Sequence, residues 1–253
     1  MVRRVSIFVY GVVSYAIFFA TFLYAIGFIG NFGVPRTIDG PLEGSRLAAI
    51  LTNLGLLGLF AVQHSAMARQ GFKRWLTRFI PEPAERSTYV LASSAALLLL
   101  FWQWQPMGGV VWNIEHPTGR AVAYGIFALG WGTILFCTFL INHFDLFGLR
   151  QVWLALLDRP YTPLRFTTPS LYRVVRHPLY VGWLLAFWAT PTMTATHLLF
   201  ALATTAYILI AIRLEERDLV RAHPEYATYR RRVPMLVPRL PRREAPVRAP
   251  RTA

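Results

Sequence analysis

Six apolar runs separated by polar segments dominate the pattern along the chain. The runs cover about residues 5–29, 47–66, 88–102, 121–141, 179–190 and 197–212. At 1.5 Å per residue, the first and fourth runs are long enough to cross roughly 30 Å of hydrocarbon as helices. The last two runs are short and closely spaced, which predicts a tight helical hairpin. The pattern therefore predicts an all-α, polytopic transmembrane helical bundle with five to six membrane segments.

The composition agrees with this pattern. Hydrophobic residues make up 55% of the 253 residues and charged residues only 15%, whereas a soluble domain carries about 25% charged residues. We predict a single transmembrane domain over residues 1–238. The remaining residues 239–253 are rich in Pro and Arg, which predicts a disordered basic tail.

The net charge of +14 comes almost wholly from arginine. The arginines gather beside alternate apolar runs and in the C-terminal tail, and the loops at 30–46 and 103–120 are poor in them. This asymmetry follows the positive-inside rule, so it predicts a bacterial inner-membrane protein with both termini in the cytoplasm. It gives no reason to expect nucleic acid as a partner. Cys137 is the sole cysteine and lies inside an apolar run, so we expect no disulfide and no metal site.

A polar motif opens the predicted hairpin. In Arg176-His177-Pro178, the proline suits the first turn of a helix, because its missing N–H would have no partner there. A helix start also offers free N–H groups to a carboxylate, and Arg176 adds positive charge. Gly182 lies one turn further on and is predicted to leave room for a planar ligand. The motif therefore predicts a site that receives an anion.

Two carboxylates stand at the other foot of the hairpin. Glu215 and Glu216 follow the last apolar run, where charge close to lipid is costly unless a cation meets it. Either Arg213 and Arg217 supply that cation, or a ligand does. Because the hairpin brings both feet together, the two motifs predict a site for a zwitterion. Taken singly, each motif is also typical of interfacial anchoring and charge balance.

The paired motifs resemble those of the membrane methyltransferases, a superfamily that includes isoprenylcysteine carboxyl and phospholipid methyltransferases and uses S-adenosylmethionine. The segment 226–234 also resembles the C-terminal stretch of that superfamily. The resemblance implies that S-adenosylmethionine is the cofactor and that it binds at the cytoplasmic foot of the hairpin, within about residues 143–235. It implies cofactor-binding roles for Arg176, His177, Pro178, Tyr180, Gly182, Glu215 and Glu216.

Sequence blocks that precede the hairpin motif point to a smaller group within this superfamily. Residues 63–69, 72–75, 85–89 and 142–149 are similar to the bacterial methanethiol S-methyltransferases, and also to the related membrane proteins of the NnrU type. The implied function is methyl transfer to a small thiol, most simply methanethiol to dimethyl sulfide, in contact with the lipid bilayer and without an obligate protein partner. The alternatives are methylation of an isoprenylcysteine carboxylate or a phospholipid headgroup, or a non-enzymatic NnrU-type accessory role.

A thiol acceptor needs to be deprotonated, because the thiolate is the nucleophile. His143, Asp145 and His64 lie at the predicted cytoplasmic ends of spans and are the candidate catalytic residues. His143 also suits a helix C-terminal cap, Asp145 also suits an ion pair with Arg150, and His64 also suits a paired intramembrane histidine. Tyr172 lies just before the hairpin motif and is predicted to close the cofactor site.

Overall fold

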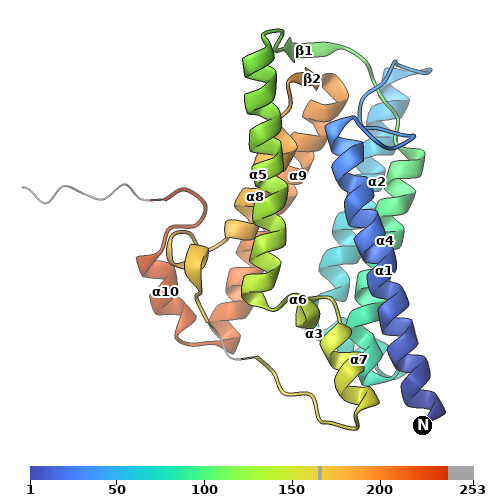
Figure 1. Ribbon diagram of the computed structural model, residues 1–253, viewed down its shortest axis with the longest axis vertical. Coiled ribbons are helices and arrows are strands. Elements are labelled where there is room, and N and C mark those ends of the chain that lie inside the picture. The colour runs from blue at the N-terminus through green and yellow to red at the C-terminus, as the bar shows by residue number, and fades with distance from the viewer. Residues whose placement is uncertain (165–166, 239–253) are drawn as a thin grey trace, which may run out of the picture.

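The computed structural model describes residues 1–164 and 167–238, whose long helices run side by side in one bundle (Figure 1). The prediction of an all-α polytopic membrane fold is confirmed. The predicted tail 239–253 lies outside the described residues. In chain order the elements are α1 (Val2–Gly30), α2 (Arg46–Met67), α3 (Gln70–Leu76), η1 (Glu82–Ala84), α4 (Glu85–Gln103), β1 (Val110–Asn113), α5 (Pro117–Ile141), α6 (His143–Leu146), α7 (Leu149–Leu156), η2 (Ser170–Arg173), α8 (Pro178–Trp188), β2 (Thr192–Thr194), α9 (Ala195–Ala222) and α10 (Tyr226–Arg232).

Within the described residues, four helices are long and apolar enough to cross a membrane, namely α1, α2, α5 and α9. The helix α4 has 19 residues and packs against both α1 and α2. The helix α8 has 11 residues, which gives a length of about 16 Å, roughly half of a hydrocarbon core. Five to six membrane segments therefore remain a prediction, which depends on how α4 and α8 lie in the bilayer.

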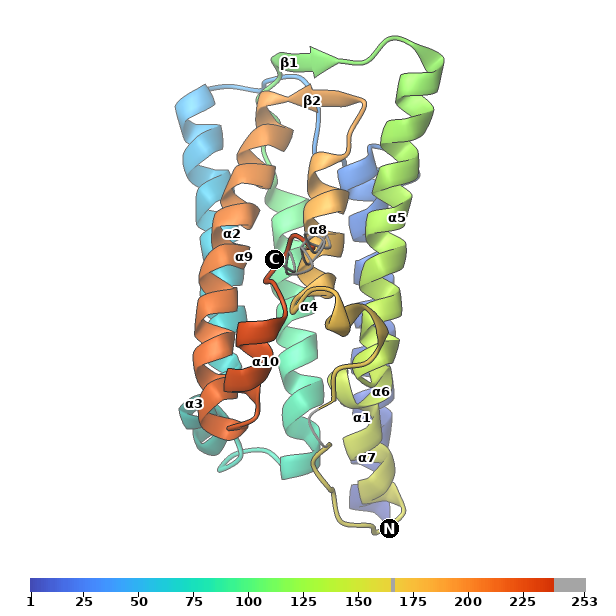
Figure 2. The same cartoon turned by 90° about the vertical axis from the view of Figure 1, so that its left-hand side faces the viewer.

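The long helices form two groups, α1 with α2 and α4, and α5 with α8 and α9 (Figures 1 and 2). A shared hydrophobic core joins the groups. Its fully buried or nearly fully buried members include Phe28, Leu100, Phe127, Ala186 and Ile212. Because these residues come from α1, α4, α5, α8 and α9, the core fixes both feet of the hairpin to the rest of the bundle.

The link between α8 and α9 differs from the tight hairpin turn that we predicted. The three residues of β2 pair antiparallel with β1, and Val110 lies opposite Thr194 in the register. Both strands are rich in β-branched residues, which favour extended backbone. Pattern analysis missed this small sheet because the pairing joins loops about eighty residues apart in sequence.

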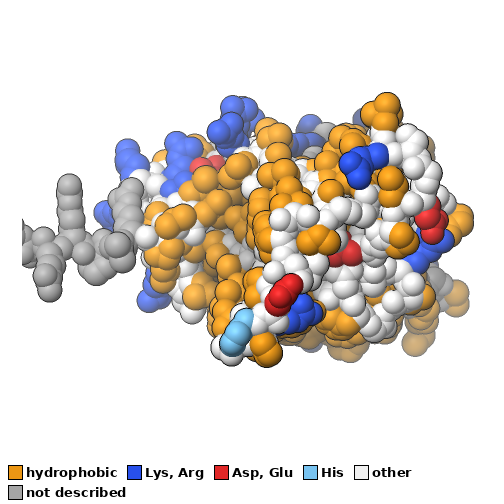
Figure 3. Space-filling view, turned by 90° about the horizontal axis from the view of Figure 1, so that it is seen from above, with side chains coloured by type: hydrophobic (Ala, Val, Ile, Leu, Met, Phe, Trp, Pro, Cys, Tyr) orange, Lys and Arg blue, Asp and Glu red, His pale blue; other side chains and the backbone are white. Residues whose placement is uncertain are grey.

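The two ends of the bundle differ in charge. At the strand end, which carries β1 and β2, basic and acidic side chains are mixed among hydrophobic ones (Figure 3). Arginines predominate at the opposite end, where α3, α6, α7 and the N-terminus lie (Figure 1). We call this opposite end the basic end. The short helix α7 lies at this end, and its Val152 packs against Gly11 of α1.

Glycines allow α5 and α8 to approach closely. A side chain added at Gly182 would lie 2.9 Å from the carbonyl oxygen of Gly130 and 3.0 Å from the amide nitrogen of Ile134. The space beside Gly182 is therefore filled by the backbone of α5. The prediction that Gly182 leaves room for a planar ligand is wrong, because the glycine serves helix packing instead.

Replacing Gly130 with Ala tests this contact. The new methyl group would meet the amide nitrogen of Ala186 at 2.6 Å, so we expect a loss of about 1–3 kcal/mol in unfolding free energy from overpacking. Gly132→Ala is the matched control, because a side chain there meets nothing within 4 Å among the described residues. Thermal unfolding in detergent measures both. Equal melting temperatures for the two variants would contradict the close contact.

The helix α9 is longer than the predicted apolar run and reaches Ala222. Its last ten residues are mostly Arg, Leu, Glu and Ala, which are strong helix formers, and Pro224 follows the end. Glu215 and Glu216 are therefore helical residues rather than loop residues. At about 100° per residue they point in different directions.

Candidate active site

The start of α8 is tied to the C-terminal segment of the chain. Pro178 occupies the first turn of the helix, as predicted. The backbone N–H groups of Arg176 and His177 donate to the carbonyls of Pro234 and Met235 over 2.8 and 3.2 Å. The segment that follows α10 therefore runs against the opening motif of the hairpin.

The buried carboxylate of Glu216 bonds to several polar side chains beside the start of α8. Glu216 Oε1 accepts hydrogen bonds from Arg176 Nε at 2.7 Å and from Tyr226 at 3.3 Å, and it lies 3.0 Å from His177 Nε2. Arg176 Nη1 also donates to the carbonyl of Val233 over 2.5 Å. We call Arg176, His177, Glu216 and Tyr226 the Glu216 cluster. The positive charge that we predicted for a ligand carboxylate is thus already paired within the protein.

The tyrosines of α10 stay neutral hydrogen-bond donors. Burial, together with the negative charge of Glu216, raises the pKa of Tyr226. Burial also raises the pKa of Tyr229 to about 12. The Tyr229 hydroxyl donates to the backbone carbonyl of Tyr172 over 2.5 Å. The helix α10 therefore fastens both the start of α8 and the turn η2.

The contacts of Glu215 differ from those of the adjacent Glu216. Its Oε2 accepts a hydrogen bond from the Tyr180 hydroxyl at 3.1 Å, and it has no ion pair among the described residues. Neither Arg213 nor Arg217 pairs with it. Tyr89 and Tyr172 lie within electrostatic range of its charge. Glu215 is thus an accessible carboxylate that faces tyrosines and lacks a cation.

Tyr172 lies within electrostatic range of this carboxylate, and its closing of the cofactor site stays a prediction. Burial raises the pKa of its hydroxyl, and the negative charge of Glu215 raises it further. The turn η2 that holds Tyr172 immediately precedes Val174 and the Glu216 cluster. Tyr172, Tyr180 and Glu215 therefore come together from three elements.

His143 does not lie with these residues. Its Nε2 is 2.7 Å from the Tyr15 hydroxyl, and its Nδ1 is 2.8 Å from the Thr138 hydroxyl. The ring is 3% exposed, stacks on Phe139 with a centroid distance of 4.4 Å, and has a pKa that burial lowers. Both ring nitrogens are occupied and sealed from a ligand. His143 thus joins α1 to α5 and α6 rather than acting as a base, and it lies just after the end of α5 rather than capping it.

We expect His143→Ala to reduce stability but not turnover. The change removes a buried ring and its hydrogen bonds, which costs about 2–5 kcal/mol of unfolding free energy. Phe144→Ala is the control, because Phe144 is 53% exposed on the same turn. Thermal unfolding and the turnover of the folded fraction measure the two effects. Loss of turnover in well-folded His143→Ala protein would contradict a structural role.

Asp145 is also engaged within the protein. Its Oδ1 lies 2.8 Å from Arg150 Nη1, and its Oδ2 accepts from the Tyr161 hydroxyl at 3.3 Å. The alternative interpretation, an ion pair with Arg150, is confirmed. His143 and Asp145 both lie on the short helix α6, and their side chains bond to different partners.

His64 pairs with residues of the neighbouring helix α4. The Tyr89 hydroxyl lies 2.8 Å from Nε2 and 3.0 Å from Nδ1, and the Ser93 hydroxyl lies 3.2 Å from Nδ1. Unlike His143, His64 is only partly buried. The hydrogen bonds expected of a paired intramembrane histidine are present at His64, and Tyr89 lies within electrostatic range of Glu215.

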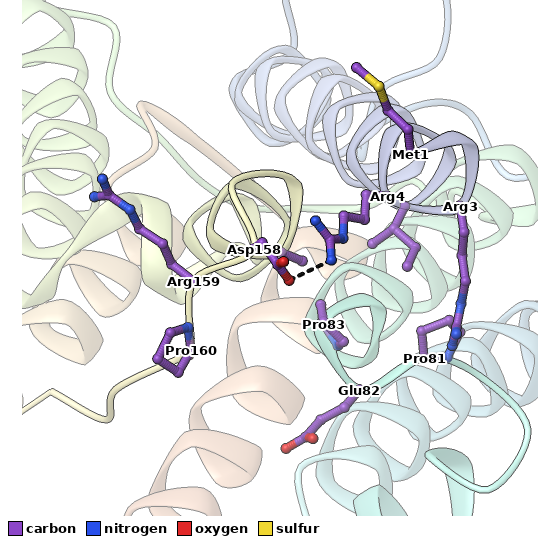
Figure 4. Close-up of a pocket in the computed structure, with 11 residues that line it drawn as sticks. Met1, Arg3, Arg4, Pro81, Glu82, Pro83, Asp158, Arg159 and Pro160 are labelled. Atoms are coloured by element: carbon purple, nitrogen blue, oxygen red, sulfur yellow. Dashed lines mark ion pairs between the residues drawn. The ribbon is translucent and has the colours of Figure 1, made fainter.

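A surface hollow of about 780 Å³ lies elsewhere, at the basic end between α1, η1 and the end of α7 (Figure 4). It contains the ion pair of Arg4 with Asp158 at 2.6 Å, and Glu82 and Arg159 line it. It holds none of the candidate site residues. The described residues also contain no group of three or more potential metal ligands.

The contacts of Tyr89 and Ser93 with His64, and of Tyr207 with Ser65, were not predicted from the sequence. Each is a polar side chain within a helix that is otherwise mainly apolar, and such residues in a membrane protein are often functional. This signal was available, but the partner of each residue lies on another helix. The roles of the two glutamates could not be separated either, because they are adjacent in sequence.

Comparison with known proteins identifies close relatives. The chain is 57% identical to the methanethiol S-methyltransferase of Crocosphaera subtropica, over 93% of this chain and 92% of that relative. It is 55% identical to the methanethiol S-methyltransferase of Mycobacterium tuberculosis, over 93% of this chain and 97% of that relative. It is 33% identical to Nurim of Bos taurus, over 77% of this chain and 78% of that protein. No protein-family model matches the chain, and no solved structure does.

Proposed function

Because the chain belongs to the methanethiol S-methyltransferase family, we propose that it transfers a methyl group from S-adenosylmethionine to methanethiol and so forms dimethyl sulfide. One observation in the structure supports the donor half of this proposal. Glu215 is an accessible carboxylate without a cationic partner in the described part of the chain, beside the start of α8. A cationic ligand would supply the missing charge.

The residues around Glu215 fit S-adenosylmethionine, which carries an ammonium group, a sulfonium, a carboxylate and a flat adenine. Glu215 offers negative charge to a cationic group, and Tyr180 and Tyr172 offer hydroxyls and ring faces beside it. The N–H groups of Leu179 and Tyr180 lie in the first turn of α8, where the helix supplies no carbonyl for them. They suit the ligand carboxylate.

The remaining motif residues position this site. Arg176, His177 and Glu216 bond to one another, and they join α8 to α9. Pro178 starts α8 at a fixed place. These four residues thus hold the start of α8 in the position where the donor would bind. Gly182 contributes by allowing α8 to pack closely against α5.

The chemistry places few demands on the protein. When bound, the donor supplies a methyl group activated by its sulfonium charge. Transfer is an in-line displacement, so the protein must orient the acceptor, exclude water and favour the thiolate. Tyr180, which bonds to Glu215, packs against the hydrophobic core, and this apolar surface suits the exclusion of water from the reacting groups.

The charge asymmetry sets the orientation that we propose. The basic end faces the cytoplasm of a bacterial cell across its inner membrane, in accord with the positive-inside rule. The start of α8 and the end of α9, which carries Glu215, lie nearer the basic end than β2 does (Figure 2). The donor would then enter from the cytoplasm, and the small apolar thiol would enter from water or lipid.

A comparison of acceptors tests the proposed function. Purified protein with labelled S-adenosylmethionine is offered methanethiol, a prenylated cysteine analogue and phosphatidylethanolamine. We expect transfer to methanethiol at a kcat/KM at least about 10³-fold above that for the two larger acceptors. Transfer to the larger acceptors alone would refute the thiol substrate. Absence of donor binding by calorimetry would refute a methyltransferase and favour an accessory protein.

A further inference from the structure

Polar side chains from three helices meet inside the bundle next to Glu215. His64 and Ser65 come from α2, Tyr89 and Ser93 from α4, and Tyr207 from α9. The donor site as proposed uses none of these five residues. Polar groups at this depth are costly in a membrane unless they bond to one another or to a ligand. Their grouping therefore calls for a functional explanation.

Aromatic rings and hydrogen bonds unite these residues into one cluster. The ring of Phe60 stacks on His64 with a centroid distance of 5.2 Å and meets Tyr207 edge-on at 6.5 Å. The Tyr207 hydroxyl lies 3.1 Å from the Ser65 hydroxyl. The Phe60 ring thus contacts both the His64 imidazole of its own helix and the Tyr207 phenol of α9. Sulfur makes favourable contacts with such aromatic rings.

A hydroxyl lies within hydrogen-bonding distance of each ring nitrogen of His64. Ser93 and Tyr89 both reach Nδ1, at 3.2 and 3.0 Å, whereas only Tyr89 reaches Nε2, at 2.8 Å. The single Tyr89 hydroxyl can bond to one nitrogen at a time. When it bonds to Nδ1, Nε2 is free to accept a proton from a ligand. The His64 residue as a whole is partly exposed.

Positive charge lies on the far side of Tyr89. The Arg86 guanidinium is 4.9 Å from the centre of the Tyr89 ring, and its Nε donates to the carbonyl of Leu146 over 2.6 Å. Both His64 and Tyr89 lie within electrostatic range of Arg86. A fixed cation favours an anion beside it, so the cluster favours a thiolate over a thiol.

The cluster also adjoins the donor site. The hydroxyls of Tyr89 and Tyr207 lie within electrostatic range of Tyr180, which bonds to Glu215. Tyr89 thus lies within electrostatic range of both the negative charge of Glu215 and the positive charge of Arg86. This polarity matches a cationic donor on the Glu215 side and an anionic acceptor on the Arg86 side.

We propose that the His64 cluster, defined as His64, Tyr89, Ser93, Ser65 and Tyr207, is the acceptor subsite and binds a small alkyl thiol. This inference rests on the proposed function. The thiol S–H proton passes to His64 Nε2, and the resulting thiolate forms a bond to the methyl carbon. The bond between that carbon and the donor sulfur breaks with its electron pair left on the donor sulfur. The imidazolium of His64 then releases its proton to water.

In this assignment His64 is a catalytic residue, and Tyr89 and Ser93 are positioning residues. The two hydroxyls hold the ring so that Nε2 faces the acceptor. The charged and titratable groups that face His64 are Tyr89 and Arg86 from α4, and Tyr207 faces the shared Phe60 ring from α9.

The test compares His64→Gln and Tyr89→Phe with wild type over pH 6–10, with methanethiol as the acceptor. Tyr10→Phe is the matched control, because it removes a hydroxyl that bonds to Thr88 on the α1 side of α4. We expect kcat/KM for methanethiol at pH 7 to fall by about 10²-fold in His64→Gln, the usual contribution of a positioned base. Tyr89→Phe should lose about tenfold, and the control should match wild type.

The pH profile separates a base from a purely structural residue. Without the base, the rate depends on thiolate already present in solution, so kcat/KM of His64→Gln should rise about tenfold per pH unit and approach wild type near pH 9. Calorimetry of donor binding shows that each variant is folded and should give wild-type affinity. A parallel, uniformly lowered profile for His64→Gln, or wild-type rates in both variants, overturns the inference. Absence of transfer by wild type refutes the proposed function instead.

Discussion

Replacing Glu215 with Gln is expected to weaken the binding of S-adenosylmethionine by about 30- to 700-fold. The change removes a negative charge that has no cationic partner of its own among the described residues. Loss of one partner of a close charge pair costs about 2–4 kcal/mol of binding free energy. Glutamine keeps the shape and can still accept the hydrogen bond from Tyr180, so the protein should fold normally.

Isothermal titration calorimetry with the purified variant measures this effect. Glu225→Gln is a suitable control, because this acid is exposed at the start of α10 and lies 3.7 Å from His223. The control should bind the donor like wild type. Undiminished donor affinity in Glu215→Gln would mean that this carboxylate does not face the donor.

Replacing Glu216 with Ala should instead destabilise the fold by about 3–5 kcal/mol. Glu216 is 8% exposed and is bonded to Arg176, His177 and Tyr226. Removal of one member leaves Arg176 buried without its counter-charge, which is the costly way to break an ion pair. The start of α8 and the segment after α10 should loosen together, because Arg176 bonds to both.

Thermal unfolding in detergent compares this variant with Asp218→Ala. Asp218 forms a similar ion pair with Arg69 at 2.6 Å, but both side chains are about half exposed. A pair of that kind contributes about 0–1 kcal/mol. Similar melting temperatures for the two variants would contradict a structural role for Glu216.

Local patterns were enough to predict the helices near the site. The apolar run at 179–190 and Pro178 predicted α8, which begins at Pro178 and ends at Trp188. The hairpin placed its two feet together, and the contacts of Tyr180 with Glu215 and of His177 with Glu216 agree with that. These features depend on residues close in sequence or on one antiparallel pairing.

The partners of individual side chains could not be predicted. His143 is held by Tyr15, which lies 128 residues earlier. Gly182 meets Gly130 on another helix, and Thr194 lies opposite Val110 in a strand pair. Each contact is set by how distant helices pack. Patterns along a single chain do not contain that information, so the roles of these residues were assigned wrongly or were missed.

The different contacts of Glu215 and Glu216 also could not be predicted from the sequence. Adjacent acids at the end of an apolar run are equivalent in sequence. Rotation of about 100° along α9 directs one to Arg176 and His177 and the other to Tyr180. Only the positions of α8 and α10 decide which acid is paired and which is left for a ligand.

Isotope tracing of the product tests the central claim most directly. Purified protein is incubated with methanethiol and S-adenosylmethionine that carries a trideuterated methyl group, and the headspace is analysed by gas chromatography with mass spectrometry. We expect dimethyl sulfide with one trideuterated methyl group per molecule, formed in equal amount with S-adenosylhomocysteine. Consumption of the donor without labelled dimethyl sulfide, or no consumption at all, would contradict the claim.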